Sequence, residues 1–180
     1  SSVNGFPLDL GEKAKAGPAL ADFNGNEKDD IVLGTDSSRV HLIYDDGSEA
    51  PGFPFQLGDT TQTAPSILDV NGDKLIFAGT GYNLGQGTDH KLYAINSDGT
   101  LRFSIEANRD LITSPSFLSY HGKQYIFFGT YDSLIYAVDT DGEAPSGWPK
   151  EANGKIVGSI VFSDLDCDGE VEIIAANESH

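Results

Sequence analysis

Two short acidic stretches of the sequence carry oxygen-bearing side chains in the same alternating pattern. Residues 22–30 and 164–172 each place Asp, Asn or Glu at positions 1, 3, 5 and 9, and an apolar run follows each stretch. A hard dication such as Ca²⁺ takes about six to eight oxygen ligands, and alternate residues of a tightly curled loop can point at one centre. The spacing therefore predicts a calcium ion in each loop.

The expected ligands are the side chains at positions 1, 3, 5 and 9 and the backbone carbonyl at position 7. They are Asp22, Asn24, Asn26, Lys28 and Asp30 in the first loop, and Asp164, Asp166, Asp168, Glu170 and Glu172 in the second. The second loop has more carboxylates, so we expect it to bind more tightly. The structural alternative is an Asp- and Asn-rich turn whose side chains bond their own backbone. Two copies with the same ninth-position ligand favour the metal.

Other metal motifs fit these loops less well. An EF-hand needs a bidentate Glu at position 12 and flanking helices, whereas position 12 here is Leu33 or Ala175, inside an apolar run. Mg²⁺ prefers fewer protein oxygens and more water. Zinc prefers His and Cys ligands, which are not present at suitable spacing.

Three landmarks recur in a fixed order around these loops. A segment related to Ala-Pro-Ser-Ile-Leu-Asp begins each unit, an apolar run ending in Gly or Ala follows, and a β-prone run ending in Asp-Gly comes third. The first landmark occupies residues 17–22, 64–69, 114–119 and 159–164, the second 31–34, 75–79, 125–129 and 173–176, and the third 40–47, 92–99 and 135–142. Each unit of about 45–50 residues holds four short strands and no helical pattern, which is typical of a propeller blade. A generic β-sandwich would not need the same signature at the same phase.

The sequence therefore predicts an all-β fold, a β-propeller of four-stranded antiparallel blades. The expected repeats are residues 11–57, 58–106, 107–150 and 151–180, and residues 1–10 are expected to form the last strand of a preceding blade. This arrangement gives three complete blades and parts of others. Since propellers have four or more blades, we expect a fragment of a larger propeller. Its open blade edges would favour self-association.

The second and third repeats have lost the metal pattern. Repeat two keeps Asp69, Asn71 and Asp73 but is two residues shorter before its apolar run. Repeat three reads Ser-Tyr-His-Gly-Lys at residues 119–123 and has no carboxylate there. We expect no ion in either.

Repeat two also carries an insertion that could bind a ligand. The segment from Gly79 to Leu92 is seven residues longer than its counterparts. Tyr82, Asn83, Gln86 and His90 in this loop would suit a sugar or a peptide, and long loops on rigid scaffolds often carry binding function. A mobile Gly-rich loop without a ligand explains the same sequence equally well.

Charge and motif content exclude several function classes. The 180 residues contain 11 Lys and Arg against 28 Asp and Glu, a net charge of −17, so binding to nucleic acid or anionic lipid is not expected. No apolar run is long enough for membrane insertion, and the single Cys167 excludes an internal disulfide. The four His residues do not cluster by spacing and no catalytic motif is present. We therefore expect a non-enzymatic chain.

These residues resemble the FG-GAP repeat, which builds the integrin α-subunit N-terminal propeller and occurs in many bacterial secreted proteins, including VCBS-type repeats. The resemblance rests on the two acidic loops, the strands around them, and the Gly-Phe-Pro or Gly-Trp-Pro elements at Gly5, Gly52 and Gly147. It implies about seven blades in the parent, Ca²⁺ as a stabilising ion, and binding rather than catalysis. The lost loops of repeats two and three depart from the family pattern.

Three functions remain open. The first is a calcium-stabilised module for adhesion or for binding a protein or carbohydrate ligand, in a secreted, periplasmic or cell-surface protein, because weak sites fill where calcium is near millimolar. The second is the propeller domain of a polysaccharide lyase or another carbohydrate-active enzyme. The third is a quinoprotein-like propeller, which the single Trp148 disfavours because that family usually repeats a Trp in every blade.

Overall fold

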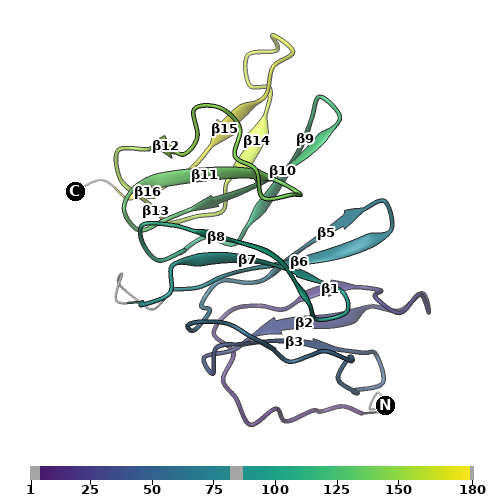
Figure 1. The fold of residues 1–180 in the computed structure, drawn as a ribbon. Coiled ribbons are helices and arrows are strands. Elements are labelled where there is room, and N and C mark those ends of the chain that lie inside the picture. Colours follow the sequence, from purple (N-terminus) through teal and green to yellow (C-terminus); the bar gives the residue numbers. More distant parts are fainter. Residues whose placement is uncertain (1–4, 82–86, 179–180) are drawn as a thin grey trace.

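Three four-stranded antiparallel sheets follow one another along the chain in the computed structural model, which describes residues 5–81 and 87–178 (Figure 1). In each sheet the strands neighbour one another in sequence order. Blade one contains β1 (Ala19–Ala21), β2 (Asp30–Gly34), β3 (Arg39–Ile43) and β4 (Phe55–Gln56). Blade two contains β5 (Ser66–Val70), β6 (Asp73–Gly79), β7 (Lys91–Asn96) and β8 (Leu101–Glu106). Blade three contains β9 (Ser116–Tyr120), β10 (Lys123–Gly129), β11 (Leu134–Asp139) and β12 (Lys150–Glu151).

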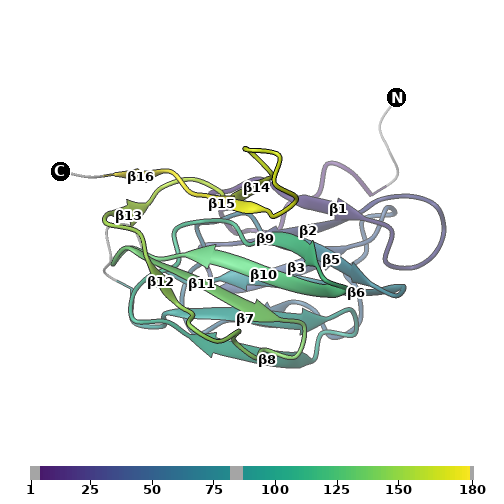
Figure 2. The same ribbon diagram turned by 90° about the horizontal axis from the view of Figure 1, so that it is seen from above.

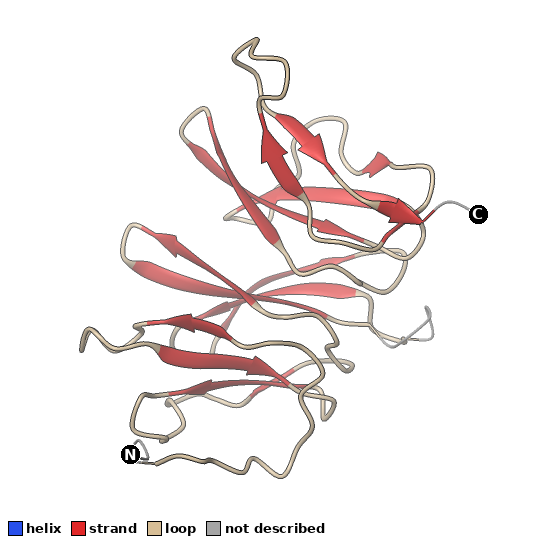
Figure 3. Cartoon of the chain, turned by 180° about the vertical axis from the view of Figure 1, so that it is seen from behind, coloured by secondary structure: helices blue, strands red, loops and turns tan. Residues whose placement is uncertain are grey.

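Four short strands at the end of the described residues form two further antiparallel pairs. They are β13 (Lys155–Ile156), β14 (Val161–Ser163), β15 (Glu172–Ile174) and β16 (Asn177–Glu178). β14 pairs with β15 and β13 with β16, both antiparallel, so the two short pairs lie along one hairpin. We call this hairpin the partial blade. Figure 3 shows that the described residues form strands and loops without a helix. They therefore include no helix that could span a lipid bilayer.

The blades pack face to face (Figure 2). An apolar cluster lies at each interface between them. The cluster between blades one and two is fully buried at its centre, where it contains Val32, Leu42, Ile76 and Ile95. Corresponding clusters join blades two and three, and blade three and the partial blade. Burying a side chain of this size contributes about 1.5–3 kcal/mol, so the interfaces supply much of the stability of the propeller. The predicted fold class is confirmed.

The continuously apolar runs are central strands with both faces covered. In β6 the five residues from Leu75 to Gly79 are all buried, and their side chains alternate between the two blade interfaces: Ile76 belongs to the cluster with blade one, and Phe77 to the cluster with blade three. A strand between two other blades needs apolar residues at every position, which explains the absence of a polar–apolar alternation.

The Gly-aromatic-Pro elements are turns that lead into short strands. Gly52 and Gly147 lie in these turns, and the strands that follow start at Phe55 and Lys150. Residues 5–10, expected as the last strand of a preceding blade, also form a turn and irregular chain. A last strand pairs with the third strand of its own blade, and the described residues before β1 include no such strand.

The turns at Gly5 and Gly52 each close against the Asp-Gly hairpin of the next blade. Gly52 has a φ of +86°, and a Cβ there would lie 2.1 Å from the carbonyl oxygen of Asp98. A Cβ on Gly99, on the other side of the contact, would lie 2.4 Å from the carbonyl oxygen of Gly52. Gly5 meets Asp46 in the same way, with a Cβ distance of 1.9 Å to its carbonyl oxygen. The contact therefore links neighbouring blades through backbone atoms, with no room for a side chain.

Replacing Gly52 with Ala tests this contact, and Gly147→Ala is the matched control. Gly147 has nearly the same φ, +83°, but its nearest neighbour is the flexible Lys150 Nζ at 3.4 Å. We expect Gly147→Ala to cost about 1–2 kcal/mol of unfolding free energy from left-handed backbone alone. Gly52→Ala should cost roughly 1–3 kcal/mol more because of the overlap. Urea unfolding of both variants measures the difference, and equal losses would contradict the contact.

Candidate metal sites

The two acidic loops share one hydrogen-bonding pattern, position by position. The first residue accepts the backbone N–H groups of positions 5 and 6, at 3.2 and 2.8 Å for Asp22 and at 3.2 and 3.0 Å for Asp164. The ninth residue accepts the N–H of position 2, at 2.8 Å for Asp30 and 2.6 Å for Glu172. In both loops the side-chain oxygen of position 3 accepts the N–H of position 5, and the side-chain oxygen of position 5 accepts the N–H of position 7. The loops are therefore copies of one structure.

The curl of each loop depends on two residues with left-handed backbone. Positions 4 and 6 have positive φ in both loops: +77° and +65° at Gly25 and Glu27, and +63° and +91° at Cys167 and Gly169. Each loop thus uses Gly at one of the two positions and a side-chain-bearing residue at the other. This backbone curls each loop so that the side chains at positions 3 and 5 accept backbone N–H groups of the same loop.

The second loop brings carboxylates together. Asp164, Asp166 and Glu172 each offer a carboxylate oxygen, and these oxygens all lie within 4.8 Å of one another. Asp168 and Glu170, also predicted as ligands, are not members of this group. Three negative charges at this separation repel one another, and a bound cation would relieve the repulsion. The donor set is all oxygen, which fits a hard cation such as Ca²⁺.

The first loop differs in the burial of its ninth residue and in a positive charge at position 7. Asp30 is fully buried and accepts the N–H of Asp45, at the end of β3, at 3.0 Å. The Lys28 ammonium lies 2.7 Å from the Asp45 carboxylate and so points to a residue that follows β3. Its hydrogen bond and charge hold the pKa of Asp45 below the ordinary value. Of Lys28, only the backbone carbonyl is then available as a ligand.

Asp22 stays ionised by virtue of its loop. Desolvation acts to raise its pKa, but the backbone N–H groups of Glu27, Gly25 and Asn26 outweigh desolvation and set the pKa below the ordinary value. A depressed carboxylate pKa stabilises the folded loop above the unfolded-state pKa, and this contribution is lost as the pH falls through the folded-state pKa. The same ionised form is the one that can bind a cation.

The corresponding segments of blades two and three are plain hairpin turns. Asn71 and Gly72 connect β5 to β6 with φ values of +56° and +94°, and His121 and Gly122 connect β9 to β10 in the same way. The Asp69 carboxylate accepts the N–H of Gly72 and lies 3.5 Å from the Lys74 ammonium. A two-residue turn has no interior that could hold an ion.

The second loop also contacts the neighbouring blade. The Tyr120 hydroxyl, at the end of β9, donates a short hydrogen bond to the Glu170 carboxylate. This bond raises the pKa of Tyr120 above its ordinary value. Glu170 therefore joins the partial blade to blade three by its side chain, which leaves its backbone carbonyl for the predicted role.

Of the predicted ligand loop, Tyr82, Asn83 and Gln86 lie outside the described residues, and His90 is within them. The His90 Nδ1 atom lies 2.7 Å from Oδ1 of Asp110, which is fully buried, although the ring N–H is not aligned as a hydrogen bond. Asp110 also accepts the N–H of Gly87 at 3.1 Å. Because β6 is antiparallel to both neighbours, residues 87–90 lie at the opposite end of blade two from the β5–β6 turn (Figure 1).

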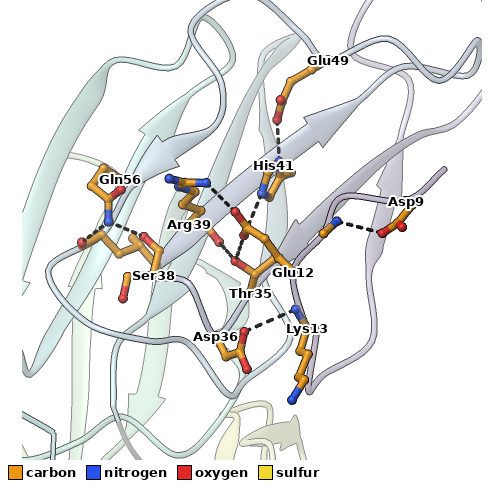
Figure 4. A network of polar contacts seen from close by, with 12 residues as sticks. Asp9, Glu12, Lys13, Thr35, Asp36, Ser38, Arg39, His41, Glu49 and Gln56 are labelled. Atoms are coloured by element: carbon orange, nitrogen blue, oxygen red, sulfur yellow. Dashed lines mark hydrogen bonds and ion pairs between the residues drawn. The ribbon is translucent and has the colours of Figure 1, made fainter.

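A second histidine, His41, lies between the carboxylates of Glu12 and Glu49. Its distance from them in the sequence gave no indication of this contact. The His41 side chain is only 5 % exposed; its Nδ1 lies 2.6 Å from Glu49 and its Nε2 lies 3.3 Å from Glu12 (Figure 4). Only a doubly protonated ring can donate to both carboxylates. Thr35 and Arg39 also donate to Glu12. The network attaches the segment before β1 to blade one and leaves no open position for a substrate.

Comparisons with known proteins agree with the fold and leave the family open. No protein-family model matches the sequence. A stretch of 55 residues, 31% of this chain, is 36% identical to Lambda-carrageenase from Pseudoalteromonas carrageenovora, of which it covers 6%. Among solved structures, BamB from Moraxella catarrhalis gives a TM-score of 0.62 at 17% identity, over 94% of this chain and 45% of BamB. The structure of BBS1N in complex with ARL6 gives a TM-score of 0.60 at 15% sequence identity, over 92% of this chain and 46% of the matched chain.

These likenesses support a β-propeller fold. At 15–17% identity these solved structures support the fold and nothing more. This chain spans less than half the length of BamB or of BBS1N. It matches a still smaller part of the carrageenase.

Cys167→Gly tests whether the loop conformation is built into the chain. Cys167 is exposed, so its side chain loses no packing, and the equivalent residue of the first loop is already Gly25. Removing Cβ at a left-handed position should raise the unfolding free energy by about 0.5–1 kcal/mol. Cys167→Ser keeps Cβ and serves as the control. In chemical denaturation, equal stabilisation by both variants would argue against this cause.

Proposed function

We propose that this chain is a calcium-binding, calcium-stabilised part of a β-propeller that serves as a ligand-binding or adhesion module. The observation that carries the proposal is the convergence of the Asp164, Asp166 and Glu172 carboxylates within 4.8 Å, in a loop whose hydrogen bonds repeat those of residues 22–30. An Asp-rich turn explains one such loop. It does not explain why both loops have a carboxylate at position 9, Asp30 in the first and Glu172 in the second.

Calcium would act at the edges of the blades. Each loop connects the first two strands of its unit, β1 to β2 and β14 to β15, so an ion there fixes the end of the strand pair. A bound dication would also offset part of the net charge of −17. Any affinity for the unfolded chain is small because the ligands are brought together only by the folded loop, so binding would add to stability by mass action.

The proposed environment is one with abundant calcium. Exposed loops with a few carboxylates bind calcium in the range typical of extracellular modules, about 10⁻⁴–10⁻³ M. Such sites fill in a secreted, periplasmic or cell-surface protein. The ligand that the module would bind remains a protein or a carbohydrate.

Thermal unfolding in calcium and in chelator tests the metal. At a concentration of 100 times Kd, one site adds roughly 2.7 kcal/mol, which corresponds to a rise of roughly 5–10 °C in Tm for a chain of this size. Asp164→Asn and Glu172→Gln keep the oxygen that accepts the backbone N–H but remove charge, and each should abolish most of the rise due to the second loop.

Asp69→Asn is the matched control, because Asp69 occupies the same phase of repeat two but caps a plain turn. It should leave the calcium response unchanged. A Tm that is insensitive to calcium in the unsubstituted chain would reduce both loops to ordinary turns, and an equal loss in Asp69→Asn would place the ion elsewhere.

The likeness to Lambda-carrageenase favours a second candidate. In this second candidate function, the chain is the propeller domain of a carbohydrate-active enzyme whose catalytic residues lie in other segments of the protein. The parent protein would then lower the viscosity of a carrageenan solution and release new chain ends, and this chain alone would not. Inactivity of the full-length parent on a panel of polysaccharides would exclude the candidate.

A further inference from the structure

A polar cleft of about 400 Å³ lies between blades two and three. One wall is the end of β5 and the turn that follows it, at residues 69–71. The other wall combines the β9–β10 hairpin, at residues 119–124, with the end of β11 and its turn, at residues 139–141. These turns lie at the same end of the two blades as the metal loops of the neighbouring units (Figure 1). The cleft is therefore at the opposite end of blade two from residues 87–90.

The cleft lies where blade one has a long loop instead of a turn. In blade one, the side chains of Asn26 and Lys28 each bond to the Asp45 carboxylate at 2.7 Å, so the loop reaches the hairpin that follows the third strand. Thr140 is the counterpart of Asp45 when the Asp-Gly hairpins are aligned. Among the described residues, no side chain of the two-residue turn of blade three bonds to the hairpin at Thr140. The loss of the metal loop thus leaves a space beside this hairpin.

Several polar side chains that line this space have no partner within residues 5–81 and 87–178. They are Asn71, Ser119, Lys123, Gln124 and Thr140. Asp139 uses its Oδ1 atom to accept the N–H groups of Asp141 and Glu143, at 3.0 and 2.9 Å, and its second oxygen accepts no bond from the described part of the chain. The cleft therefore combines unused donors and unused acceptors.

The charges around the cleft balance one another. Two of its three carboxylates, those of Asp69 and Asp141, each have a Lys or Arg nitrogen within 3.5 Å. The third, Asp139, is offset by the ammonium of Lys123. The three carboxylates are not among the described groups that converge closely enough to hold a metal ion. The cleft thus differs from the metal loops and is locally neutral in a chain with a net charge of −17.

We propose that this cleft binds a neutral carbohydrate, which deepens the ligand-binding function proposed above and rests on it. Each sugar hydroxyl can both donate and accept a hydrogen bond, so a sugar needs the mixture of free groups that the cleft offers. The volume lies within the range of about 300–1,000 Å³ that is usual for small-ligand sites. A protein partner would need about 800 Å² of contact surface, and an apolar ligand would need apolar walls. A sulfated glycan would find no net positive charge.

Titration of the ¹⁵N-labelled chain with lactose, cellobiose and maltose, in saturating calcium, tests the cleft. We expect at least one of these neutral sugars to cause saturable amide chemical-shift changes at residues 69–71, 119–124 and 139–141. Sulfated forms of the same sugars should bind more weakly. Because the interaction is between a neutral ligand and a neutral site, the dissociation constant should stay the same when salt is added to screen charges.

Two variants change the cleft by different means. Gln124→Leu keeps the size of the side chain but removes the amide, and Ser119→Phe fills the cleft from an exposed position of β9. Each should weaken sugar binding about tenfold or more, because hydrogen bonds or space are lost. Ser104→Phe is the matched control, since Ser104 is an exposed strand residue of β8 outside the cleft, and it should bind sugar like the unsubstituted chain.

The calcium response of the same samples separates this proposal from the one before it. If calcium raises Tm but none of the sugars causes a saturable shift at tens of millimolar, the cleft proposal is overturned and the calcium-stabilised propeller stands. Shift changes at other residues, equal losses in Ser119→Phe and Ser104→Phe, or tighter binding of a sulfated sugar would also overturn it. Sugar binding at the cleft in a chain whose Tm ignores calcium would support the cleft and contradict the metal.

Discussion

Backbone N–H groups that bond to carboxylate and amide oxygens of the same loop are the interaction on which the candidate sites depend. Acidic side chains that converge on one point repel one another, and residues 22–30 and 164–172 offset this repulsion with bonds to their own N–H groups before any cation is considered. The first and ninth residues, Asp22 with Asp30 and Asp164 with Glu172, close the loop from both ends. In the second loop the oxygens of Asp164, Asp166 and Glu172 lie within 4.8 Å of one another, and a hard dication takes oxygen ligands of this kind. Two left-handed residues per loop make the curl possible, and they occupy the same positions in both copies.

Packing between blades is the second constraint, and it explains features that no single blade needs. The central strands are apolar on both faces because each lies between two other blades. The Gly-aromatic-Pro turns have no room for a side chain because a backbone hairpin of the next blade lies against them, as Gly52 does against Asp98 and Gly99. The turn at Gly147 has the same left-handed backbone but only the Lys150 side chain near its Cβ position. The metal loops and the interblade turns are thus separate devices, one stabilising the strand pair within a blade and the other joining consecutive blades.

Local sequence was sufficient for much of this and insufficient where a contact comes from afar. Repeating Asp-Gly turns and apolar runs ending in Gly predicted the blades. The spacing of acidic residues singled out Asp164, Asp166 and Glu172, whose carboxylate oxygens lie within 4.8 Å of one another, and also Asp168, which is not in that group. The turn at Gly52 gave no local signal of its partner, because the hairpin that it contacts, at Asp98 and Gly99, lies more than forty residues later in the sequence. The surroundings of His41 were missed because Glu12 lies 29 residues away in sequence. His90 was noted as a ligand candidate for its loop, but its partner, the buried Asp110, comes from the connection to the next blade and gave no local signal.

Anomalous diffraction from crystals grown with calcium tests the central claim most directly, because it locates the ion without relying on stability. Two peaks are predicted, one inside residues 22–30 and one inside residues 164–172, each with oxygen ligands at about 2.3–2.6 Å that include Asp22 or Asp164. The turn at Asn71 and Gly72 should give none. Data from calcium-saturated crystals with no peak in either loop, and with both aspartates bonded only to backbone N–H groups, would contradict the account.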